Sequence, residues 1–499
     1  MIKISVNGKV YEREKGFFIE SLIKEAEGIS MPCGGHGKCG KCKVYVKGNV
    51  NPLTENEKRL LTEGEIEKGI RLACNLIAEG ECEITLSDNF GKAEIITEGF
   101  MGEFSVNHDF SSYGVAVDIG TTTLCARLYD KNGRCMAESS CLNSQKAWGA
   151  DVISRIEADL KGDGKALSSS VSSDINYLIE DMAKKADILP EGIESLVVTG
   201  NTAMLHFLTN TDTSPLSKAP FKAERLFGEE LAAKDINLTS LKEDAKVYLP
   251  PCISAFVGGD VVCALLAADI YDKKGTNLLV DIGTNGEAIL LKDKKLTVCS
   301  TAAGPAFEGA GLAFGMMGRS GAIDKVWTEN GKIAFHVIGD GKAKGICGSG
   351  IIDAVASLLK TEEIDETGYM EEDFLLSEGV YVTKDDVRAI QLAKSAIKSG
   401  VETLLNEDNT AFDDVESFVI AGGFGKKLDI TSAELIGLIP KGVKKKARII
   451  GNGALSGASM LLLDRSLREK CIVISKSAKN IELSTNAFFI DKYMENMMF

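Results

Sequence analysis

The chain contains the same short motif twice, an apolar run that ends in Asp-Ile-Gly-Thr and leads into a second strand-like run. The copies are GVAVDIGTTTLCARLYD in residues 114–130 and NLLVDIGTNGEAILLKD in residues 277–293. Each copy predicts a hairpin whose turn offers backbone N–H groups and hydroxyls to a phosphate. A single glycine-containing hairpin turn is common and would be a weak signal. Two copies predict a duplicated fold whose halves grip one polyphosphate between them.

Two aspartates and the residues after them are the predicted nucleotide contacts. Asp118 and Asp281 end the two apolar runs and are placed to hold Mg²⁺ through water, because carboxylate oxygens are ligands that this ion prefers. Asp281 is also a candidate catalytic residue. The predicted phosphate-binding residues are Gly120, Thr121, Thr122, Thr123, Gly283, Thr284, Asn285 and Gly286.

Near the N-terminus, the stretch MPCGGHGKCGKCKV in residues 31–44 holds three cysteines, and a fourth follows in RLAC. The spacing is C-x5-C-x2-C-x31-C, close to the plant-type ferredoxin pattern with one extra residue in the first gap. Glycines between these cysteines allow positive φ angles and close approach of the backbone to a cluster. We therefore predict a 2Fe-2S cluster, with the ligands Cys33, Cys39, Cys42 and Cys74.

Two other metal sites compete with this interpretation of the cysteines. Structural zinc sites usually pair two short Cys-x-x-Cys or Cys-x-x-His units, and only one short pair is present here. His36 lies inside the loop and could be a Rieske-type ligand, but four cysteines already satisfy two irons. Both alternatives are less consistent with the spacing than a 2Fe-2S cluster.

The charge and hydropathy of the chain exclude several classes of partner. Asp and Glu outnumber Lys and Arg by 72 to 57, and the formal net charge is −15, so no basic excess is available for nucleic acid or an anionic membrane surface. No apolar run reaches the roughly 18 residues of a membrane helix, and the start of the chain lacks the apolar core of a signal peptide. We expect a cytoplasmic protein.

The motifs divide the 499 residues into a small and a large module. Residues 1–88 are predicted to form a ferredoxin-like domain that opens with a hairpin around Asn7-Gly8, because Asn-Gly is a strong hairpin signal. Residues 89–112 show weak periodicity and are predicted to be a linker. Residues 113–499 are predicted to form one ATPase domain with two lobes.

The large module resembles the acetate and sugar kinase, Hsc70 and actin (ASKHA) superfamily of ATPases. The two DIGT stretches resemble its phosphate motifs, and GNGALSGASMLLL in residues 451–463 resembles its glycine-bearing helix. FVIAGGFGKKLD in residues 418–429 resembles its adenosine motif, which assigns Gly422, Gly423 and Gly425 to the nucleotide. The implied fold class is a β-grasp 2Fe-2S ferredoxin-like domain followed by a duplicated actin-like (ribonuclease H-like) domain, α+β and α/β in character.

A further stretch, VGGDVVCALLAAD in residues 257–269, resembles a sugar-kinase segment whose aspartate is the catalytic base. Asp260 is therefore the candidate that orients or deprotonates the nucleophile, which is water in a pure ATPase. Asp260 could also be the N-cap of a helix that begins before VVCALLA, a position that Asp favours.

Together the two modules resemble the reductive activators of corrinoid proteins. The motifs that carry this resemblance are GGHGKCGKC, VAVDIGTTT, FVGGD, LLVDIGTNGE, TAAGPAFEGA, CGSGIIDA and AGGFG. The resemblance implies an enzyme that hydrolyses ATP with Mg²⁺ and passes one electron from the cluster to Co(II) of a corrinoid protein, regenerating Co(I) for methyl transfer. It also implies an upstream electron donor and a homodimer.

Other functions remain open at this point. The chain could be an ATP-gated electron donor to a non-corrinoid enzyme, although such activators hold a 4Fe-4S cluster between subunits and lack a ferredoxin domain. It could be a small-molecule kinase with an attached redox domain, because Asp260 would serve phosphoryl transfer equally well. A redox-sensing scaffold without catalysis is disfavoured, because both phosphate motifs keep their aspartate.

Overall fold

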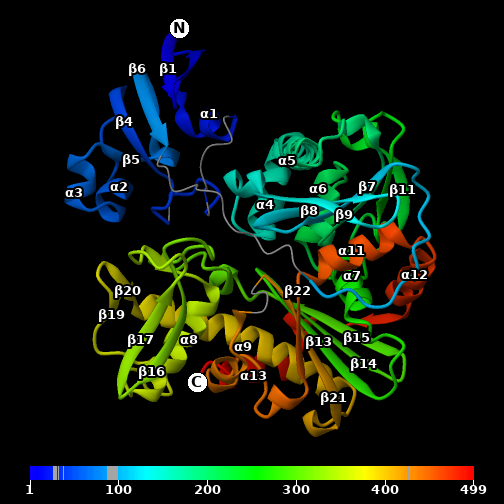
Figure 1. The fold of residues 1–499 in the computed structure, drawn as a ribbon. Coiled ribbons are helices and arrows are strands. Elements are labelled where there is room, and N and C mark those ends of the chain that lie inside the picture. Colours follow the sequence, from blue (N-terminus) through cyan, green and yellow to red (C-terminus); the bar gives the residue numbers. More distant parts are fainter. Residues whose placement is uncertain (26–30, 32, 38, 87–98, 424–426) are drawn as a thin grey trace.

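The computed structural model describes residues 1–25, 31, 33–37, 39–86, 99–423 and 427–499. Figure 1 shows a small N-terminal unit at the upper left, beside the first of two larger lobes and above the second. In the part of the chain that the structure describes, no helix combines the length and apolar character needed to cross a membrane.

The N-terminal unit is a six-stranded sheet in the order β2-β1-β6-β4-β5, with β3 paired to β6. The predicted Asn7-Gly8 step forms the β1–β2 hairpin, and both residues have positive φ. Helix α1 buries Ile19, Leu22 and Ile23 against Ile4 and Ile84 of the sheet, which is the β-grasp arrangement. The elements are β1 (Ile2–Val6), β2 (Lys9–Arg13), β3 (Phe17–Phe18), α1 (Ile19–Glu25), β4 (Lys43–Val50), α2 (Glu55–Leu60), α3 (Glu63–Glu67), β5 (Ile70–Leu72) and β6 (Ile77–Leu86).

The first lobe is built on a six-stranded sheet in the order β11-β12-β10-β7-β8-β9. The first DIGT motif ends strand β7, which pairs antiparallel with β8 and parallel with β10. The elements of this lobe are β7 (Tyr113–Ile119), β8 (Thr123–Asp130), β9 (Cys135–Leu142), α4 (Val152–Ala158), α5 (Gly164–Ala186), β10 (Ile193–Gly200), α6 (Thr202–Leu208), β11 (Glu229–Ala232), β12 (Lys246–Leu249) and α7 (Gly259–Ala268).

The second lobe repeats this plan with a sheet in the order β22-β21-β13-β14-β15-β23. The second DIGT motif ends β13, which pairs antiparallel with β14 and parallel with β21. The repeated elements are β13 (Thr276–Ile282), β14 (Gly286–Lys292), β15 (Lys295–Thr301), α9 (Lys384–Glu407), β21 (Val415–Gly422), α10 (Ile430–Leu435), β22 (Ala447–Gly451) and α11 (Gly453–Leu463). The sequence repeat therefore corresponds to a duplicated fold, as predicted.

Further elements surround this repeated plan. They are β16 (Ala322–Glu329), β17 (Lys332–Val337), β18 (Gly345–Ile346), α8 (Gly348–Lys360), β19 (Phe374–Ser377), β20 (Val380–Val382), α12 (Leu467–Ser477), β23 (Ala478–Asn480) and α13 (Ala487–Glu495).

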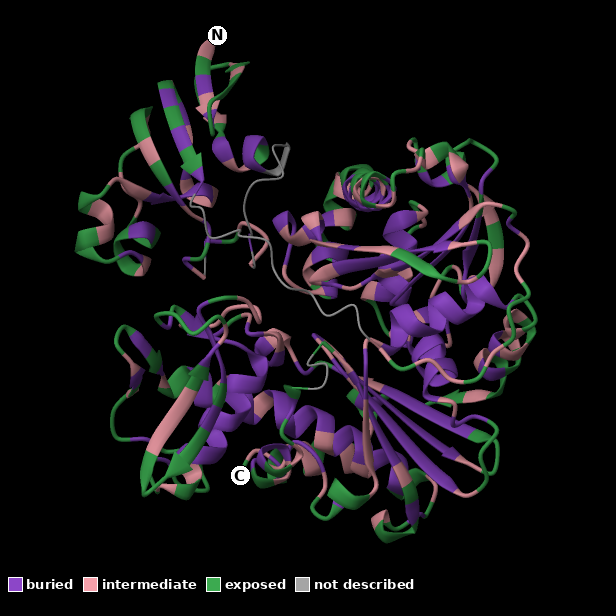
Figure 2. Cartoon of the chain, viewed as in Figure 1, coloured by how far each residue is buried: buried purple, intermediate pink, exposed green. Residues whose placement is uncertain are grey.

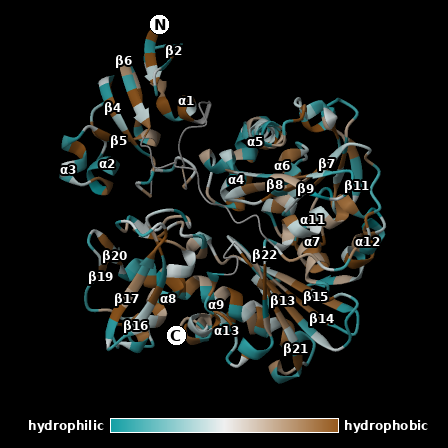
Figure 3. Cartoon of the chain, in the orientation of Figure 1, coloured by the Kyte–Doolittle hydropathy of each residue, from teal (hydrophilic) through white to brown (hydrophobic). Residues whose placement is uncertain are grey.

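The central strands are apolar throughout because both faces of each sheet are covered, as in parallel sheets flanked by helices. In β13, Leu278 and Val280 join the core beneath α9, while Leu279 joins the core that contains α7 and α11. Figure 2 shows these strands and helices buried, and Figure 3 shows the same strands in hydrophobic colours. The continuous apolar character of the run NLLVDI is thus explained by the burial of β13 on both faces of the sheet.

Helices α7 and α11 occupy equivalent places in the two lobes and pack against each other between the sheets. Their backbones approach so closely that a Cβ on Gly457 would lie 2.0 Å from the carbonyl oxygen of Cys263. A glycine is therefore required at this crossing, which fixes the distance between the lobes.

Candidate functional site

A cavity of about 940 Å³ lies between the two lobes, where the DIGT turns face each other. The structure places most of the predicted ATPase residues on its wall, namely Asp118, Gly120, Thr121, Thr122, Thr123, Asp260, Asp281, Gly283, Thr284, Asn285, Gly422 and Gly423. Gly286 is an exception: a Cβ there would lie 2.6 Å from the Ile397 side chain, so this glycine serves packing rather than the cavity. Gly425 lies outside the described residues.

A hydrogen bond from a glycine N–H closes each turn, but the first turn joins the paired residues Ile119 and Leu124 and is one residue longer than the second, which joins Ile282 and Gly286. The N–H of Gly120 donates to the carbonyl of Thr123 at 2.9 Å, and the N–H of Gly283 donates to the carbonyl of Asn285 at 2.9 Å. In the first strand Val117 and Ile119 face the core of the lobe, so the alternation of a strand turns Asp118 toward the cavity.

Carboxyl groups crowd this cavity. Burial, together with the charge of Asp260, raises the pKa of Asp118 to about 7. A hydrogen bond from the Asn452 amide acts in the opposite direction and lowers this pKa. Burial raises the pKa of Asp260 to about 6, and burial with three neighbouring carboxylates raises that of Asp281 to about 7. A bound cation would relieve this repulsion.

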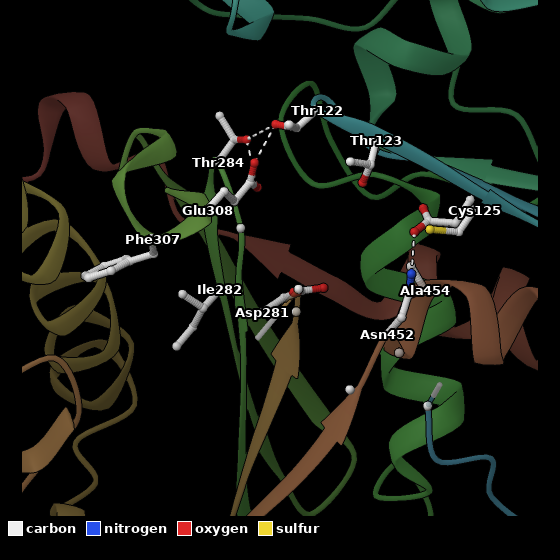
Figure 4. A pocket seen from close by; sticks show the side chains of 18 of the residues that line it. Thr122, Thr123, Cys125, Asp281, Ile282, Thr284, Phe307, Glu308, Asn452 and Ala454 are labelled. Carbon is white, nitrogen blue, oxygen red and sulfur yellow. Dashed lines mark hydrogen bonds between the residues drawn. The ribbon is translucent and has the colours of Figure 1, made fainter. Parts of the chain in front are cut away.

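The donor set fits Mg²⁺ held through water rather than directly. Hard oxygen ligands suit this ion, which usually keeps several of its waters. Among the described residues, no three His, Cys, Asp or Glu side chains converge closely enough to hold a metal ion directly. Figure 4 shows Asp281 in β13 and Asn452 directly after β22; both belong to the second lobe, and the Asn452 amide donates to Asp118 of the first lobe at 3.0 Å.

Asp260 lies in the first turn of α7, and its carboxylate accepts the backbone N–H of Val261 at 2.8 Å. The N-cap of α7 is Gly258, so the alternative that Asp260 is the N-cap is wrong. The helix begins at Gly259, one residue before the aspartate and two before the apolar run. Its catalytic role stays a prediction.

Several cavity residues were not predicted from the sequence. Glu287 is the register partner of Asp281 across the β13–β14 hairpin, so its spacing from Asp281 was a usable signal. Glu308 and Asn452 also line the cavity. Glu308 belongs to the motif TAAGPAFEGA, but no local pattern shows that it faces the first turn.

The four predicted cluster ligands form two pairs. The Sγ atoms of Cys33 and Cys39 lie 3.4 Å apart, and those of Cys42 and Cys74 lie 3.3 Å apart. Two sulfur ligands of one tetrahedral metal stand roughly 3.8 Å apart for metal–sulfur bonds of about 2.3 Å. Two pairs suit a binuclear cluster in which each metal takes two cysteines, and they do not suit one zinc ion with four.

The two thiols of the second pair influence each other's pKa. Their hydrogen bond lowers the pKa of the Cys42 thiol to about 7 and raises that of the Cys74 thiol, while burial raises the pKa of Cys39. His36 lies beside Glu157 of the first lobe, with 4.0 Å between ring nitrogen and carboxylate. The Rieske alternative therefore receives no support.

The cysteine loop rests on the first lobe. The N–H of Met31 donates to the carbonyl of Lys146 at 3.2 Å, and a Cβ on Gly34 would lie 3.1 Å from the carbonyl of Trp148. This segment follows Asn143, whose amide donates to the carbonyl of Gly120 at 2.8 Å. The loop and the first phosphate turn are thus joined through one short stretch of chain.

Fold and site together define a class: an iron–sulfur protein of the ferredoxin type fused to an ASKHA-type ATPase domain. Family models agree with each part. A 2Fe-2S iron–sulfur cluster binding domain matches residues 4–79, the RACo middle region matches 113–273, and the C-terminal ASKHA domain of RACo matches 275–499.

Individual relatives narrow this class. The corrinoid activation enzyme RamQ of Eubacterium limosum is 37% identical over 421 residues, covering 78% of this chain and 70% of the relative. A reductase from Methanosarcina barkeri, described as acting on the Co(II) methylated amine-specific corrinoid protein, is 26% identical, covering 77% of this chain and 76% of its own. A solved reductive activator for corrinoid, iron–sulfur protein superposes with a TM-score of 0.73 at 26% identity, covering 100% of this chain and 98% of its own. The chain belongs to the family of reductive activators of corrinoid proteins.

Proposed function

We propose that this protein reactivates a corrinoid protein by passing it one electron in an ATP-dependent reaction, returning Co(II) to Co(I). The observation that carries the proposal is the presence, in one chain, of two cysteine pairs fit for a 2Fe-2S cluster and a cavity between two phosphate turns. The names of the relatives support the corrinoid substrate.

The energetics explain why ATP is needed. Moving one electron uphill by about 100 mV costs about 2.3 kcal/mol, and a plant-type cluster sits near about −400 mV. A lower-potential acceptor therefore needs a coupled source of free energy. Nucleotide binding can supply it if the lobes bind the nucleotide differently in two conformations.

Each group of residues has a role in this proposal. Cys33, Cys39, Cys42 and Cys74 hold the cluster, which supplies one-electron chemistry when bound. The two turns bind the phosphates through N–H groups and hydroxyls, and Asp118 and Asp281 hold Mg²⁺ through water. Asp260 orients or deprotonates the attacking water.

The link between the sites runs through the first lobe. The guanidinium of Arg155 donates to the carbonyl of Thr121 in the first phosphate turn and to the carbonyl of Gly149, next to the segment that supports the cysteine loop. Arg155 is fully buried, and Asn143 holds the same turn. A shift of the turn on nucleotide binding is therefore transmitted to the segment that supports the cysteine loop.

The experiment mixes anaerobically reduced protein with a Co(II) corrinoid protein and follows the corrinoid spectrum with and without MgATP. We expect Co(I) only when MgATP is present. Hydrolysis of ATP and normal cluster reduction with unchanged Co(II) would contradict the corrinoid substrate and favour another acceptor. The upstream donor, the homodimer and the cytoplasmic location are part of the proposal and need separate measurements.

Two variants separate the halves of the reaction. Cys42→Ser is expected to remove the visible absorption and the electron transfer while nucleotide binding persists. Asp281→Ala is expected to abolish ATP-dependent activation while a dye still reduces the cluster. Retained colour with normal iron in the first variant, or wild-type ATP turnover in the second, contradicts the corresponding assignment.

A further inference from the structure

Glu308 lies where the two phosphate turns meet. Its carboxylate accepts the hydroxyl of Thr122 from the first lobe and the hydroxyl of Thr284 from the second, the latter at 2.9 Å. The two hydroxyl oxygens are 3.3 Å apart. Figure 4 shows this contact as a bridge across the cavity between the lobes.

The carboxylate uses the donors that such turns offer a phosphate. Burial raises the pKa of the Glu308 carboxyl overall, although the two hydroxyls and the backbone of Thr284 lower it. A Cβ on Gly283 would lie 3.4 Å from a Glu308 oxygen, so the carboxylate sits against the bare backbone of the second turn. Hydroxyls and N–H groups at a turn form an anion site, and here the anion is a side chain.

A phosphate cannot share these donors with Glu308. A phosphoryl group that accepted both hydroxyls would have to occupy the place of the carboxylate, and two anions at contact distance repel strongly. The phosphate must displace Glu308, and the Thr122–Glu308–Thr284 bridge must then break.

The position in the cavity indicates which phosphate this is. The predicted adenosine end lies at Gly422, the last residue of β21, and at Gly423, while the bridge lies beyond the ends of β7 and β13. A phosphate chain that runs from the adenosine end toward the two turns is expected to place its last group in the gap between them. We propose that Glu308 occupies the γ-phosphate position when ATP is absent, and that ATP, unlike ADP, displaces it.

This inference rests on the proposed ATP site and adds the way in which the protein distinguishes ATP from ADP. Thr122 belongs to one lobe, while Glu308 and Thr284 belong to the other. The bridge is intact with ADP and broken with ATP. The contact between the lobes therefore depends on whether the bound nucleotide carries a γ-phosphate.

The test compares the Kd of MgADP with that of MgAMPPNP, a non-hydrolysable ATP analogue, in titration calorimetry of the complete chain. Glu308→Gln keeps the shape but removes the charge, and Glu308→Ala removes the group. We expect both variants to bind MgAMPPNP about tenfold more tightly, a change of about 1.4 kcal/mol. MgADP binding should stay within about twofold, which also shows that the variants are folded.

The outcomes separate the possible roles of Glu308. Weaker binding of MgAMPPNP in Glu308→Gln overturns the inference, because the carboxylate would then assist the nucleotide or its Mg²⁺. An equal gain for MgADP and MgAMPPNP overturns the γ-phosphate assignment. Failure of the wild-type protein to bind either nucleotide overturns the proposed function instead. Glu329→Gln, on the exposed part of β16, is the matched control and should change neither Kd.

Discussion

Five strands of each lobe follow the same order, β12-β10-β7-β8-β9 and β22-β21-β13-β14-β15, but the chemistry of the two lobes is unequal. Asp118 pairs across its hairpin with Cys125, whereas Asp281 pairs with Glu287. The second residue of α7 is Asp260, while the second residue of α11 is Ala454. Duplication thus provides two related turns and two facing helices. Residue differences at equivalent positions then place Glu287 in the second lobe and Asp260 in the first.

The largest expected effect is on the rate of ATP hydrolysis, and it tests Asp260 of α7, which has no acidic counterpart in α11. Asp260→Asn should lower the rate of ATP hydrolysis by about 10²–10⁴-fold, the usual contribution of a general base, while the Kd of MgATP changes little. Steady-state hydrolysis and calorimetry measure the two quantities. Asp269→Asn, at the other end of α7 in a left-handed conformation that Asn also tolerates, is the control. Unchanged hydrolysis in Asp260→Asn removes the catalytic role.

The next largest effect is on stability and concerns the contact between α7 and α11. Gly457→Ala should lower the free energy of unfolding by about 3 kcal/mol, the upper part of the range for overpacking, because a backbone carbonyl blocks the added methyl. Chemical denaturation measures this change. Gly423→Ala, whose added Cβ has no atom of the described residues within 4 Å, should have a much smaller effect. Equal stabilities would show that the helices can separate without cost.

The pH dependence of stability should be shared by the two lobes. Burial raises the pKa of both aspartates to about 7, so the folded protein binds more protons than the unfolded chain, where Asp titrates near about 3.9. Without Mg²⁺, stability should therefore fall as pH rises from about 4 to about 7.

Melting temperatures across this pH range, without Mg²⁺ or nucleotide, check the sign. Asp281→Asn and Asp118→Asn should flatten the curve to a similar extent, because the pKa of each aspartate is raised to about 7. A stability that rises with pH, or a curve that neither variant flattens, contradicts this linkage. MgATP should bind more tightly at pH 8 than at pH 6, since Mg²⁺ favours charged carboxylates.

The smallest expected effect is on stability and concerns the N-terminal ends of α7 and α11. Asn452 caps α11 by accepting the N–H of Leu455 at 2.8 Å, while α7 begins at Gly258 without a side-chain cap. Asn452→Ala should lower the free energy of unfolding by about 1 kcal/mol. Denaturation curves measure this change, and a variant as stable as wild type would show that the cap contributes nothing.

Local patterns predicted the features that depend on neighbours in sequence. The repeated apolar runs predicted the duplicated fold because each central strand is buried on both faces, and the cysteine spacing predicted a set that the structure brings together in pairs. Contacts made by topology were not predictable. Glu308 is 186 residues from Thr122, and no local spacing reports that contact. Gly286 was assigned to the nucleotide because the motif contains it, but the packing of α9 against β14 explains it better.

The support of the cysteine loop has a consequence for protein engineering. The loop meets the first lobe through the main-chain carbonyls of Lys146 and Trp148, so this part of the fit depends on the path of the backbone, while His36 beside Glu157 adds a contact between side chains. A foreign ferredoxin module grafted onto this ATPase needs a glycine at the place of Gly34 and a free amide at the place of Met31. Chimeras chosen by these two requirements are the starting point for exchanging the electron carrier while keeping the nucleotide-driven part.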